Sequence, residues 1–284
     1  MSMVELSPPV FAILSALIEE KTGLHYGLAD RDLLAGKLSV RAQEAGFDSL
    51  LDYYYYLRYD PAAGAELGAL IDTLVIGETY FFREYEPLRV LVDEFLAPWC
   101  ASGRRPRVWS AACATGEEPL TLAMMLADRG LLDAVDIVAT DISQRALARA
   151  RAGRFGARSV RVVPTPGLAA RYLRPAGPGY TIDPTLLARI SWRQANLVDA
   201  ALTEPLGRFD AVLCRNVFIY FHDRTIRVVV ERLASALVPG GVLLVGVAES
   251  LLRFGTLFVG EERDGAFVYR REITHEAHPR ADRR

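Results

Sequence analysis

Two patterns of hydrophobic and polar positions divide the chain. Up to about residue 76, apolar residues recur every three or four positions, beginning with Phe11, Leu14 and Leu17, which is the spacing of an amphipathic helix. Glycines and capping residues interrupt this pattern at intervals that suit short helices. We expect four helices: one that ends at Gly23, one over about 32–45, one begun by Ser49 with Asp52 in a capping box, and one over about 63–74.

Beyond residue 106 the pattern changes to short apolar runs that alternate with helical stretches. Strands that alternate with helices indicate a parallel sheet covered on both faces. The expected helices are 117–126, a helix capped by Ser143 and 223–237, and the expected strands are 107–112, 136–140, 190–194, 210–214, 242–247 and 267–271. Prolines and glycines crowd residues 164–191, where we expect an inserted excursion with a β-hairpin near 180–182.

Composition narrows the class of protein. The chain has 284 residues, 51% of them hydrophobic, enough for one large or two modest domains. The apolar run from Val10 to Ile18 is too short to span a bilayer, and Glu5 stands where a signal peptide has basic residues. We therefore expect a cytoplasmic protein without membrane insertion. Three scattered cysteines and four histidines lack the spacing of a metal site, so no metal is expected.

Charge is unevenly distributed. Residues 1–76 carry 5 basic and 11 acidic side chains, a net charge of −6, whereas the remainder carries 28 and 24, a net charge of +4. Neither part is basic enough to predict nucleic acid as the main ligand. The four adjacent tyrosines Tyr53 to Tyr56 point in different directions on a helix, so we expect them to serve packing and surface roles rather than base stacking.

The first strand–turn–helix carries the strongest chemical signal, the stretch Ala112-Cys113-Ala114-Thr115-Gly116-Glu117-Glu118-Pro119. Nucleotide-like cofactors bind outside the carboxyl ends of parallel strands, and a glycine there permits close approach. A dinucleotide site needs three glycines and no acid beside the phosphates. One glycine followed by two acids favours a positively charged cofactor without phosphate, such as S-adenosylmethionine. An ordinary turn capped by acids is the alternative.

Polar residues also end the neighbouring strands. Asp141 follows the second strand, where a carboxylate can accept hydrogen bonds from ribose hydroxyls, although it can also cap the next helix. Asn196, before Leu197, offers an amide to an adenine edge. Arg215 and Asn216 follow the strand at 210–214 and precede Tyr220, either at a substrate site or as caps for neighbouring carbonyls.

These residues together resemble the chemotaxis receptor methyltransferases, the CheR-type proteins. The resemblance covers nearly the whole chain, and its most specific parts are the first and last of the matching motifs. The motifs are Glu78-Thr79-Tyr80-Phe81-Phe82-Arg83, 112–119, Ala139-Thr140-Asp141-Ile142, Asn196-Leu197 and Cys214-Arg215-Asn216-Val217-Phe218-Ile219-Tyr220-Phe221.

The resemblance implies an α/β fold: a Rossmann-like class I methyltransferase domain with a small inserted β-subdomain, preceded by an all-helical N-terminal domain. It places the helical domain at 1–76, a linker that contributes to the cofactor pocket at 77–90, the methyltransferase domain at 91–271 with its insertion at about 173–191, and a disordered tail at 272–284. In some members the insertion docks a peptide tether of the receptor.

The resemblance also assigns the site. Arg83 and Tyr220 are the expected catalytic residues, with Tyr220 near the transferred methyl group. The expected cofactor-binding residues are Gly77, Thr79, Arg83, Gly116, Glu117, Glu118, Asp141, Asn196, Leu197, Arg215 and Asn216. The cofactor is S-adenosylmethionine, the product S-adenosylhomocysteine, and the partner a chemoreceptor or other signalling protein, with the enzyme acting as a monomer.

The chain departs from the family at three points. Gly77 stands where many members have Asn, Ala114 replaces a common Ser, and the helix that is basic in the family offers only Lys37 and Arg41 inside an acidic domain. The leading hypothesis is a protein-glutamate O-methyltransferase. The alternatives are a methyltransferase for a small molecule and an S-adenosylmethionine-binding sensor or scaffold without turnover. No histidine lies in a cofactor motif, so we expect a reaction without a general base.

Overall fold

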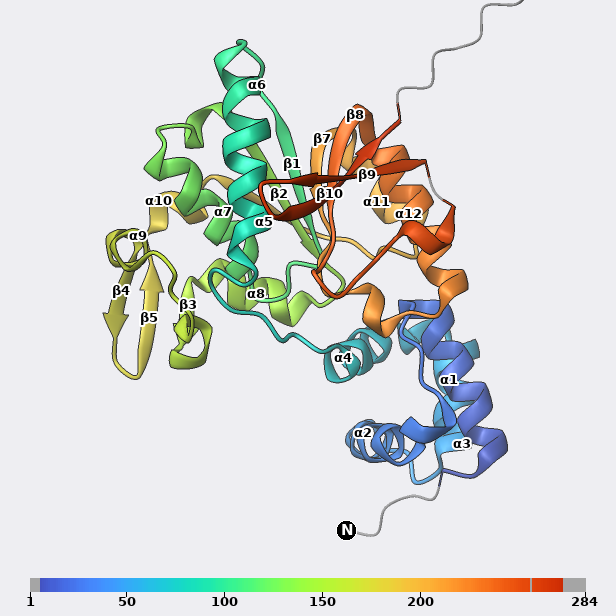
Figure 1. Ribbon diagram of the computed structural model, residues 1–284. Coiled ribbons are helices and arrows are strands. Elements are labelled where there is room, and N and C mark those ends of the chain that lie inside the picture. The colour runs from blue at the N-terminus through green and yellow to red at the C-terminus, as the bar shows by residue number, and fades with distance from the viewer. Residues whose placement is uncertain (1–5, 256, 273–284) are drawn as a thin grey trace, which may run out of the picture.

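The computed structural model describes residues 6–255 and 257–272. All but the first residue of the expected tail at 272–284 lies outside this part of the chain. The N-terminal region forms the four helices that the sequence predicts and, in addition, two short 3-10 turns (Figure 1). They are α1 (Pro8–Thr22), η1 (Leu28–Asp30), α2 (Arg31–Glu44), α3 (Leu50–Tyr59), η2 (Pro61–Ala63) and α4 (Gly64–Leu74).

Gly23 and Ser49 cap the helices as expected, and of the expected capping box the Ser49 half is formed. Gly23 ends α1 with φ +81°, and the Ser49 hydroxyl accepts a hydrogen bond from the backbone N–H of Asp52 at 3.3 Å. The tyrosines on α3 divide as expected for a helix: Tyr53 is fully buried whereas Tyr55 is 53% exposed. Burial and the hydrogen bond that the Tyr53 hydroxyl donates to Glu66, at 2.6 Å, raise the pKa of Tyr53. The aromatic run is therefore a packing feature.

The second domain is built on a seven-stranded sheet with the order β6-β2-β1-β7-β8-β10-β9 (Figure 1). The first five strands in this order are parallel, and β10 and β9 add antiparallel pairs at one edge. The strands are β1 (Arg107–Ala111), β2 (Asp136–Asp141), β6 (Ile190–Gln194), β7 (Phe209–Leu213), β8 (Leu237–Leu244), β9 (Phe258–Arg263) and β10 (Ala266–Arg271).

Helices cover both faces of this sheet, and a separate apolar cluster fills each face. Residues 85–101 form one long helix, with a π-helical segment between two α-helical ends. The bounds are α5 (Tyr85–Val90), η3 (Leu91–Leu96), α6 (Ala97–Ala101), α7 (Glu117–Asp128), η4 (Leu132–Ala134), α8 (Gln144–Ala152), α11 (Ala200–Thr203), η6 (Glu204–Leu206), η7 (Phe218–Tyr220), α12 (Asp223–Ala236) and η8 (Leu252–Phe254).

A small antiparallel sheet lies beside α8, with the order β3-β5-β4 (Figure 1). Its strands are β3 (Arg154–Gly156), β4 (Leu173–Ala176) and β5 (Gly179–Ile182), and the helical turns η5 (Ala157–Val160), α9 (Pro166–Tyr172) and α10 (Pro184–Leu187) adjoin them. The β4–β5 hairpin lies where the sequence suggested a hairpin, and the sheet also takes in β3. Phe155 on β3 packs edge-on against Phe81, with ring centroids 4.8 Å apart. This contact joins the small sheet to the linker.

The helical domain is attached to the carboxyl end of the sheet. Leu24 and Phe221 form an antiparallel β-bridge, and the His25 backbone N–H donates to the Tyr220 carbonyl at 2.9 Å. The Asn196 amide donates to the Lys21 carbonyl at 2.7 Å. The two domains therefore meet where the strands end. No helix in the described ranges has the length and apolar character that crossing a membrane requires.

Candidate functional site

A cavity lies at the carboxyl ends of the parallel strands, and both domains line it. With its open mouth it holds about 1070 Å³ of free space. The helical domain and linker contribute one side of the wall, and the loops after β1, β2, β6 and β7 contribute the other. The lining residues include Thr22, Leu24, Val75, Gly77, Glu78, Thr79, Tyr80, Arg83, Ala114, Glu118, Asp141, Ile142, Asn196, Leu197, Arg215, Asn216 and Tyr220. The structure thus gathers nine of the eleven expected cofactor residues, together with Tyr220, around one space.

Asp141 ends β2 and reaches the cavity while remaining only 7% exposed. Its two carboxylate oxygens accept backbone hydrogen bonds from Ser143 and Ala114, both at 2.8 Å. Burial raises the pKa of Asp141, an effect that Asp72 reinforces and that the two backbone donors partly offset. Because each carboxylate oxygen can accept more than one hydrogen bond, Asp141 keeps acceptor capacity for hydroxyl groups in the cavity.

Gly116 and Glu117 are the two expected residues that are absent from the cavity wall. A Cβ atom at Gly116 would lie 2.8 Å from both Ala150 and Trp192, so the glycine permits close packing of the loop against α8 and β6. The Glu117 carboxylate is buried and accepts hydrogen bonds from the hydroxyls of Thr115 (2.6 Å) and Ser159 (2.8 Å). Burial raises the pKa of Glu117. Cofactor contact by either residue stays a prediction.

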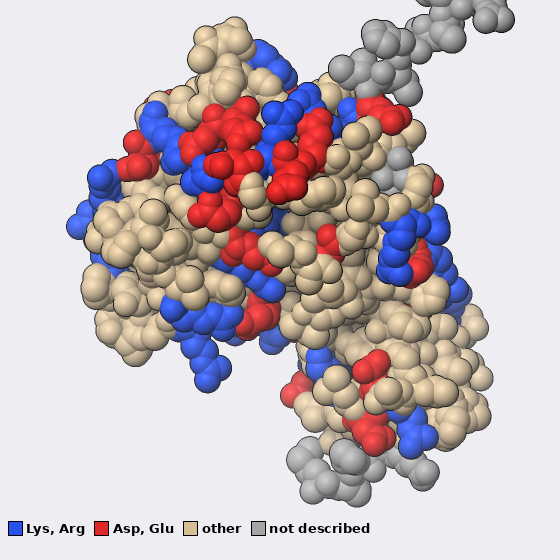
Figure 2. Space-filling model, in the orientation of Figure 1, with Lys and Arg blue, Asp and Glu red and all other residues tan. Residues whose placement is uncertain are grey.

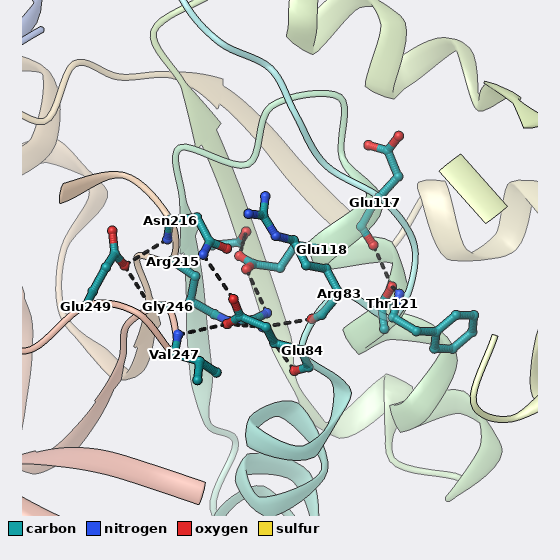
Figure 3. A network of polar contacts seen from close by, with 12 residues as sticks. Arg83, Glu84, Glu117, Glu118, Thr121, Arg215, Asn216, Gly246, Val247 and Glu249 are labelled. Carbon is teal, nitrogen blue, oxygen red and sulfur yellow. Dashed lines mark hydrogen bonds and ion pairs between the residues drawn. The ribbon is translucent and has the colours of Figure 1, made fainter. Parts of the chain in front are cut away.

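Glu118 and Arg215 form the centre of a buried polar network (Figure 3). The Arg215 side chain is 2% exposed and contacts Glu118 at 3.1 Å, while the hydroxyl of Ser110 donates to the other Glu118 oxygen at 2.7 Å. Arg215 also donates to the backbone carbonyl of Arg83 at 2.7 Å. Its Nε is buried without a hydrogen-bond partner among the described residues. One arginine thus ties the ends of β1 and β7 to the linker.

Glu84 completes this network from a strained backbone position with φ +46°. Its carboxylate accepts hydrogen bonds from the Asn216 amide (3.0 Å), from Arg215 (3.1 Å) and from the Val247 backbone (3.1 Å). Burial alone would raise the pKa of Glu84, but these hydrogen bonds and the charge of Arg215 outweigh it and hold that pKa below its usual range. Glu84 is therefore an anion held in place by the loops it joins.

Glu249, which is not among the residues that line the cavity, holds the loop after β7 in place (Figure 3). One carboxylate oxygen accepts backbone hydrogen bonds from Gly246 (2.7 Å) and Asn216 (2.8 Å), and the other accepts one from Phe218 (2.7 Å). Asn216 itself has φ +59°, a conformation that costs energy for a residue other than glycine. The carboxylate offsets this cost and fixes the chain that carries Arg215 and Tyr220.

Thr79, Arg83 and Tyr220 also line the cavity, and each is partly exposed. The Arg83 guanidinium donates to the backbone carbonyl of Glu78 at 2.6 Å and lies 5.8 Å from the centroid of the Tyr80 ring. Among the described residues, no group forms a hydrogen bond with the Tyr220 hydroxyl, so it can bind a ligand. Gly77 leaves open space where a side chain would stand.

Asn196 lines the cavity, but its amide already bridges the two domains. The amide nitrogen donates to Lys21, as above, and the oxygen accepts from the Val198 backbone at 3.1 Å. The side chain therefore has one donor and one further acceptor position left for a ligand. Adenine recognition by Asn196 stays a prediction. Its neighbour Leu197 is 7% exposed and supplies apolar wall.

Metal and histidine chemistry find no support in this region. No three His, Cys, Asp or Glu side chains of the described chain are grouped as metal ligands. His222 is the N-cap of α12, where its ring accepts from the Arg224 backbone, and it packs edge-on against the ring of His25 with centroids 5.1 Å apart. Neither histidine is among the residues that line the cavity.

Two acids of the site were missing from the sequence analysis. Glu84 stands directly after the motif that ends in Arg83, so its position in the sequence was a usable signal. Glu249 lies 33 residues from Asn216 along the chain, beyond β8, and no local pattern connects them. Only the parallel pairing of β7 with β8 brings their loops together.

Comparison with known proteins identifies the family over both domains. Residues 9–75 match the CheR methyltransferase all-alpha domain, and residues 77–263 match the CheR methyltransferase SAM binding domain. The boundary between the two matches falls beside Gly77, at the edge of the cavity.

Individual relatives agree with this match. The chain is 36% identical over 244 residues to chemotaxis protein methyltransferase 2 of Vibrio cholerae, covering 84% of each chain. It is 32% identical over 250 residues to chemotaxis protein methyltransferase 1 of Pseudomonas aeruginosa, covering 85% of this chain and 90% of the relative. It is also 34% identical to a probable biofilm formation methyltransferase of P. aeruginosa, covering 86% of this chain and 58% of that protein.

Proposed function

The chain belongs to the CheR family of S-adenosylmethionine-dependent methyltransferases, and on that basis we propose that it esterifies glutamate side chains of a chemoreceptor or related signalling protein. The observation that carries the proposal is the cavity itself, which lies at the strand ends between the two family domains. The carboxylates of Asp141 and Glu118 line it, and of the two arginines in its wall Arg215 is already paired with Glu118.

The wall fits the cofactor at several points. Asp141 has acceptor capacity for ribose hydroxyls, and Glu118 places a carboxylate in the wall. Apolar surface from Ile142 and Leu197 suits an adenine ring. S-adenosylmethionine supplies a methyl group on a positively charged sulfur. We propose that Thr79, Arg83, Arg215 and the other lining residues bind this cofactor, as the family resemblance implies.

The acceptor needs positioning more than activation. A glutamate carboxylate has a pKa of about 4.3 and is already ionised at neutral pH, so the protein has no proton to remove. Arg83 and Tyr220 line the cavity and are partly exposed, so that a guanidinium and a free hydroxyl can orient a carboxylate there. Orientation of the reacting groups is a sufficient source of rate enhancement for such a displacement.

The partner is proposed from the relatives. Two of the three relatives above are named as chemotaxis proteins and the third as a biofilm formation enzyme, so the acceptor belongs to a signalling pathway of one of these kinds. We further propose that the enzyme is a cytoplasmic monomer and that it does not act on nucleic acid. These proposals rest on the sequence.

Labelled S-adenosylmethionine tests the proposal. The protein is incubated with an extract of its native cells, with and without membranes, and the products are separated into protein and small molecules. Label on a protein that mild alkali releases as methanol is the expected result, because carboxyl esters are base-labile. Label on a metabolite would identify a small-molecule methyltransferase. Binding of the cofactor without any transfer would identify a sensor or scaffold.

A further inference from the structure

One fifty-residue segment has a strong excess of positive charge. Residues 144–193 contain ten arginines, no lysine and a single acid, Asp183, which gives a net charge of +9 in a chain of net charge −2. The segment runs through α8, the small sheet and β6. In Figure 2, basic side chains gather over β3 and the turn that follows it.

Half of these arginines are engaged within the molecule. Arg161, Arg171 and Arg189 form ion pairs with Glu78, Asp128 and Asp133, and two more donate to backbone carbonyls. The others have no hydrogen bond or ion pair within the described residues, and all are exposed: Arg149, Arg154, Arg158, Arg174 and Arg193. The fold leaves these guanidinium groups available to a ligand.

Three of the available arginines form one surface. Arg154 on β3 and Arg174 on β4 are both paired with Thr181 of the central strand, and residues directly opposite in antiparallel strands share a face. Phe155 is on the other face and is buried, so this row points outward. Arg158 follows β3 in η5. We call Arg154, Arg158 and Arg174 the arginine surface.

The arginine surface adjoins the mouth of the cavity. Three residues beyond Arg158, the guanidinium of Arg161 lies 4.1 Å from the centroid of the Tyr80 ring and pairs with Glu78 at 2.5 Å. Both Tyr80 and Glu78 line the cavity. The carbonyl of Ser159 accepts from the Phe81 backbone at 2.8 Å. The turn that carries Arg158 therefore lies next to the cavity wall, close enough for one bound protein segment to contact both.

The helical domain offers no such surface. All five of its basic side chains, Lys21, Arg31, Lys37, Arg41 and Arg58, contact acids or a carbonyl of the same domain. Arg41 is held by both oxygens of Glu66, at 2.6 Å each, and burial lowers the pKa of Lys37. Because these cations are already paired, they contribute little to the affinity for another protein.

We infer that the arginine surface binds an acidic segment of the acceptor protein, beside the glutamate presented to the cavity. This rests on the proposed function. Guanidinium groups bind carboxylates through two parallel hydrogen bonds, and an acceptor rich in glutamate supplies them. The interaction lies outside the cavity, so it governs capture of the protein and leaves cofactor binding and the transfer step unchanged.

Binding of labelled poly-L-glutamate, followed by fluorescence anisotropy at low ionic strength, tests the inference. The test variant is Arg154→Glu with Arg158→Glu. The control for net charge is Arg253→Glu with Arg263→Glu, which changes the net charge equally at exposed arginines on η8 and β9 that each already pair with an acid. We expect about tenfold weaker binding for the test variant and a change within about twofold for the control, since exposed charges act locally and are screened.

The same samples separate this inference from the proposed function. S-adenosylhomocysteine affinity is expected to be equal in all three proteins, and with the acceptor protein the test variant raises KM with kcat unchanged. Equal losses in test and control variants, no loss in either, or tighter binding of a thymidine oligonucleotide than of poly-L-glutamate would overturn the inference. If the test variant unfolds, Arg154→Gln with Arg158→Gln replaces it. Specific loss of polyglutamate binding in a protein that transfers no methyl group would instead contradict the proposed function.

Discussion

Arg215 and Arg154 belong to the same domain, but the fold treats them in opposite ways. Arg215 is 2% exposed and contacts Glu118, Glu84 and two backbone carbonyls. Arg154 is exposed and has no hydrogen bond or ion pair within the described residues. Arg215, which fixes loops, is paired with acids inside the wall of the cavity. Arg154, which is available to a partner, lies on the outer surface. We therefore expect that separate substitutions can alter cofactor binding and binding of the acceptor protein.

Removing each arginine tests this contrast most strongly. Arg215→Met leaves the partly buried carboxylates of Glu118 and Glu84 without their cation. A broken buried ion pair costs about 3–5 kcal/mol of unfolding free energy, and we expect a loss at the lower end of that range. Arg154→Met, at an exposed site, is expected to change that free energy by less than about 0.5 kcal/mol. Denaturant unfolding of both variants measures the difference. Similar losses would show that Arg215 does not hold the wall.

Glu249 is expected to give the next largest effect. Glu249→Gln keeps one acceptor oxygen but turns an amide N–H₂ toward a backbone N–H, leaving a buried donor unpaired at a cost of about 1–3 kcal/mol. Because the loop carries Arg215 and Tyr220, turnover is expected to fall with stability. Glu261→Gln, at a residue paired with exposed Arg263, is the control. Denaturant unfolding and single-turnover rates measure both effects. Wild-type stability and turnover in Glu249→Gln would show that Glu249 does not position the loop.

Arg83 and Tyr220 are expected to affect turnover more than folding. Tyr220→Phe removes a hydroxyl that no described residue binds, so stability is expected to stay constant while turnover falls about tenfold, the value of one hydrogen bond of about 1.4 kcal/mol. Arg83→Ala removes one hydrogen bond to the Glu78 carbonyl and is likewise expected to lower turnover more than stability. Wild-type turnover at matched stability would exclude the residue from the mechanism.

The smallest effect is expected at His222. His222→Ala removes a helix cap but no group of the cavity, so most activity is expected to remain. Single-turnover rates are expected to rise through the acid range as the acceptor ionises and to be flat from about pH 6 to 8. A steep rise near the pKa of histidine, about 6.5, that disappears in His222→Ala would show that a histidine base is required.

The sequence predicted the elements whose patterns are local. The helical spacing before residue 76, the caps at Gly23, Ser49 and Ser143, and the apolar strands of the parallel sheet are confirmed. β9 was missed because Phe258–Arg263 contains a glycine and ends in three charged residues, and only its pairing with β10 makes it a strand. Pairing between distant segments leaves no periodic signal.

The candidate site shows the same limit. Motif residues mark the ends of strands, so Asp141, Glu118 and Arg215 could be placed near one another from the sequence. Their hydrogen-bond partners could not. Trp192 and Ala150 lie beside Gly116 because α8 and β6 pack there, a neighbourhood that the motif does not predict. Asn196 gained a contact with Lys21 that depends on the docking of the helical domain.

Calorimetric titration with S-adenosylhomocysteine tests the central claim, that the cavity between the domains is the cofactor site, most directly. Asp141→Asn is expected to weaken affinity about 10- to 100-fold, the equivalent of 1.5–3 kcal/mol for a charged hydrogen bond. Asp136→Asn, at the exposed start of β2 beside Arg105, is expected to leave it unchanged. Because burial raises the pKa of Asp141, wild-type affinity is expected to fall on acidification at a pH above the usual aspartate range. Unchanged affinity in Asp141→Asn, with thermal unfolding as in the wild type, would contradict the account.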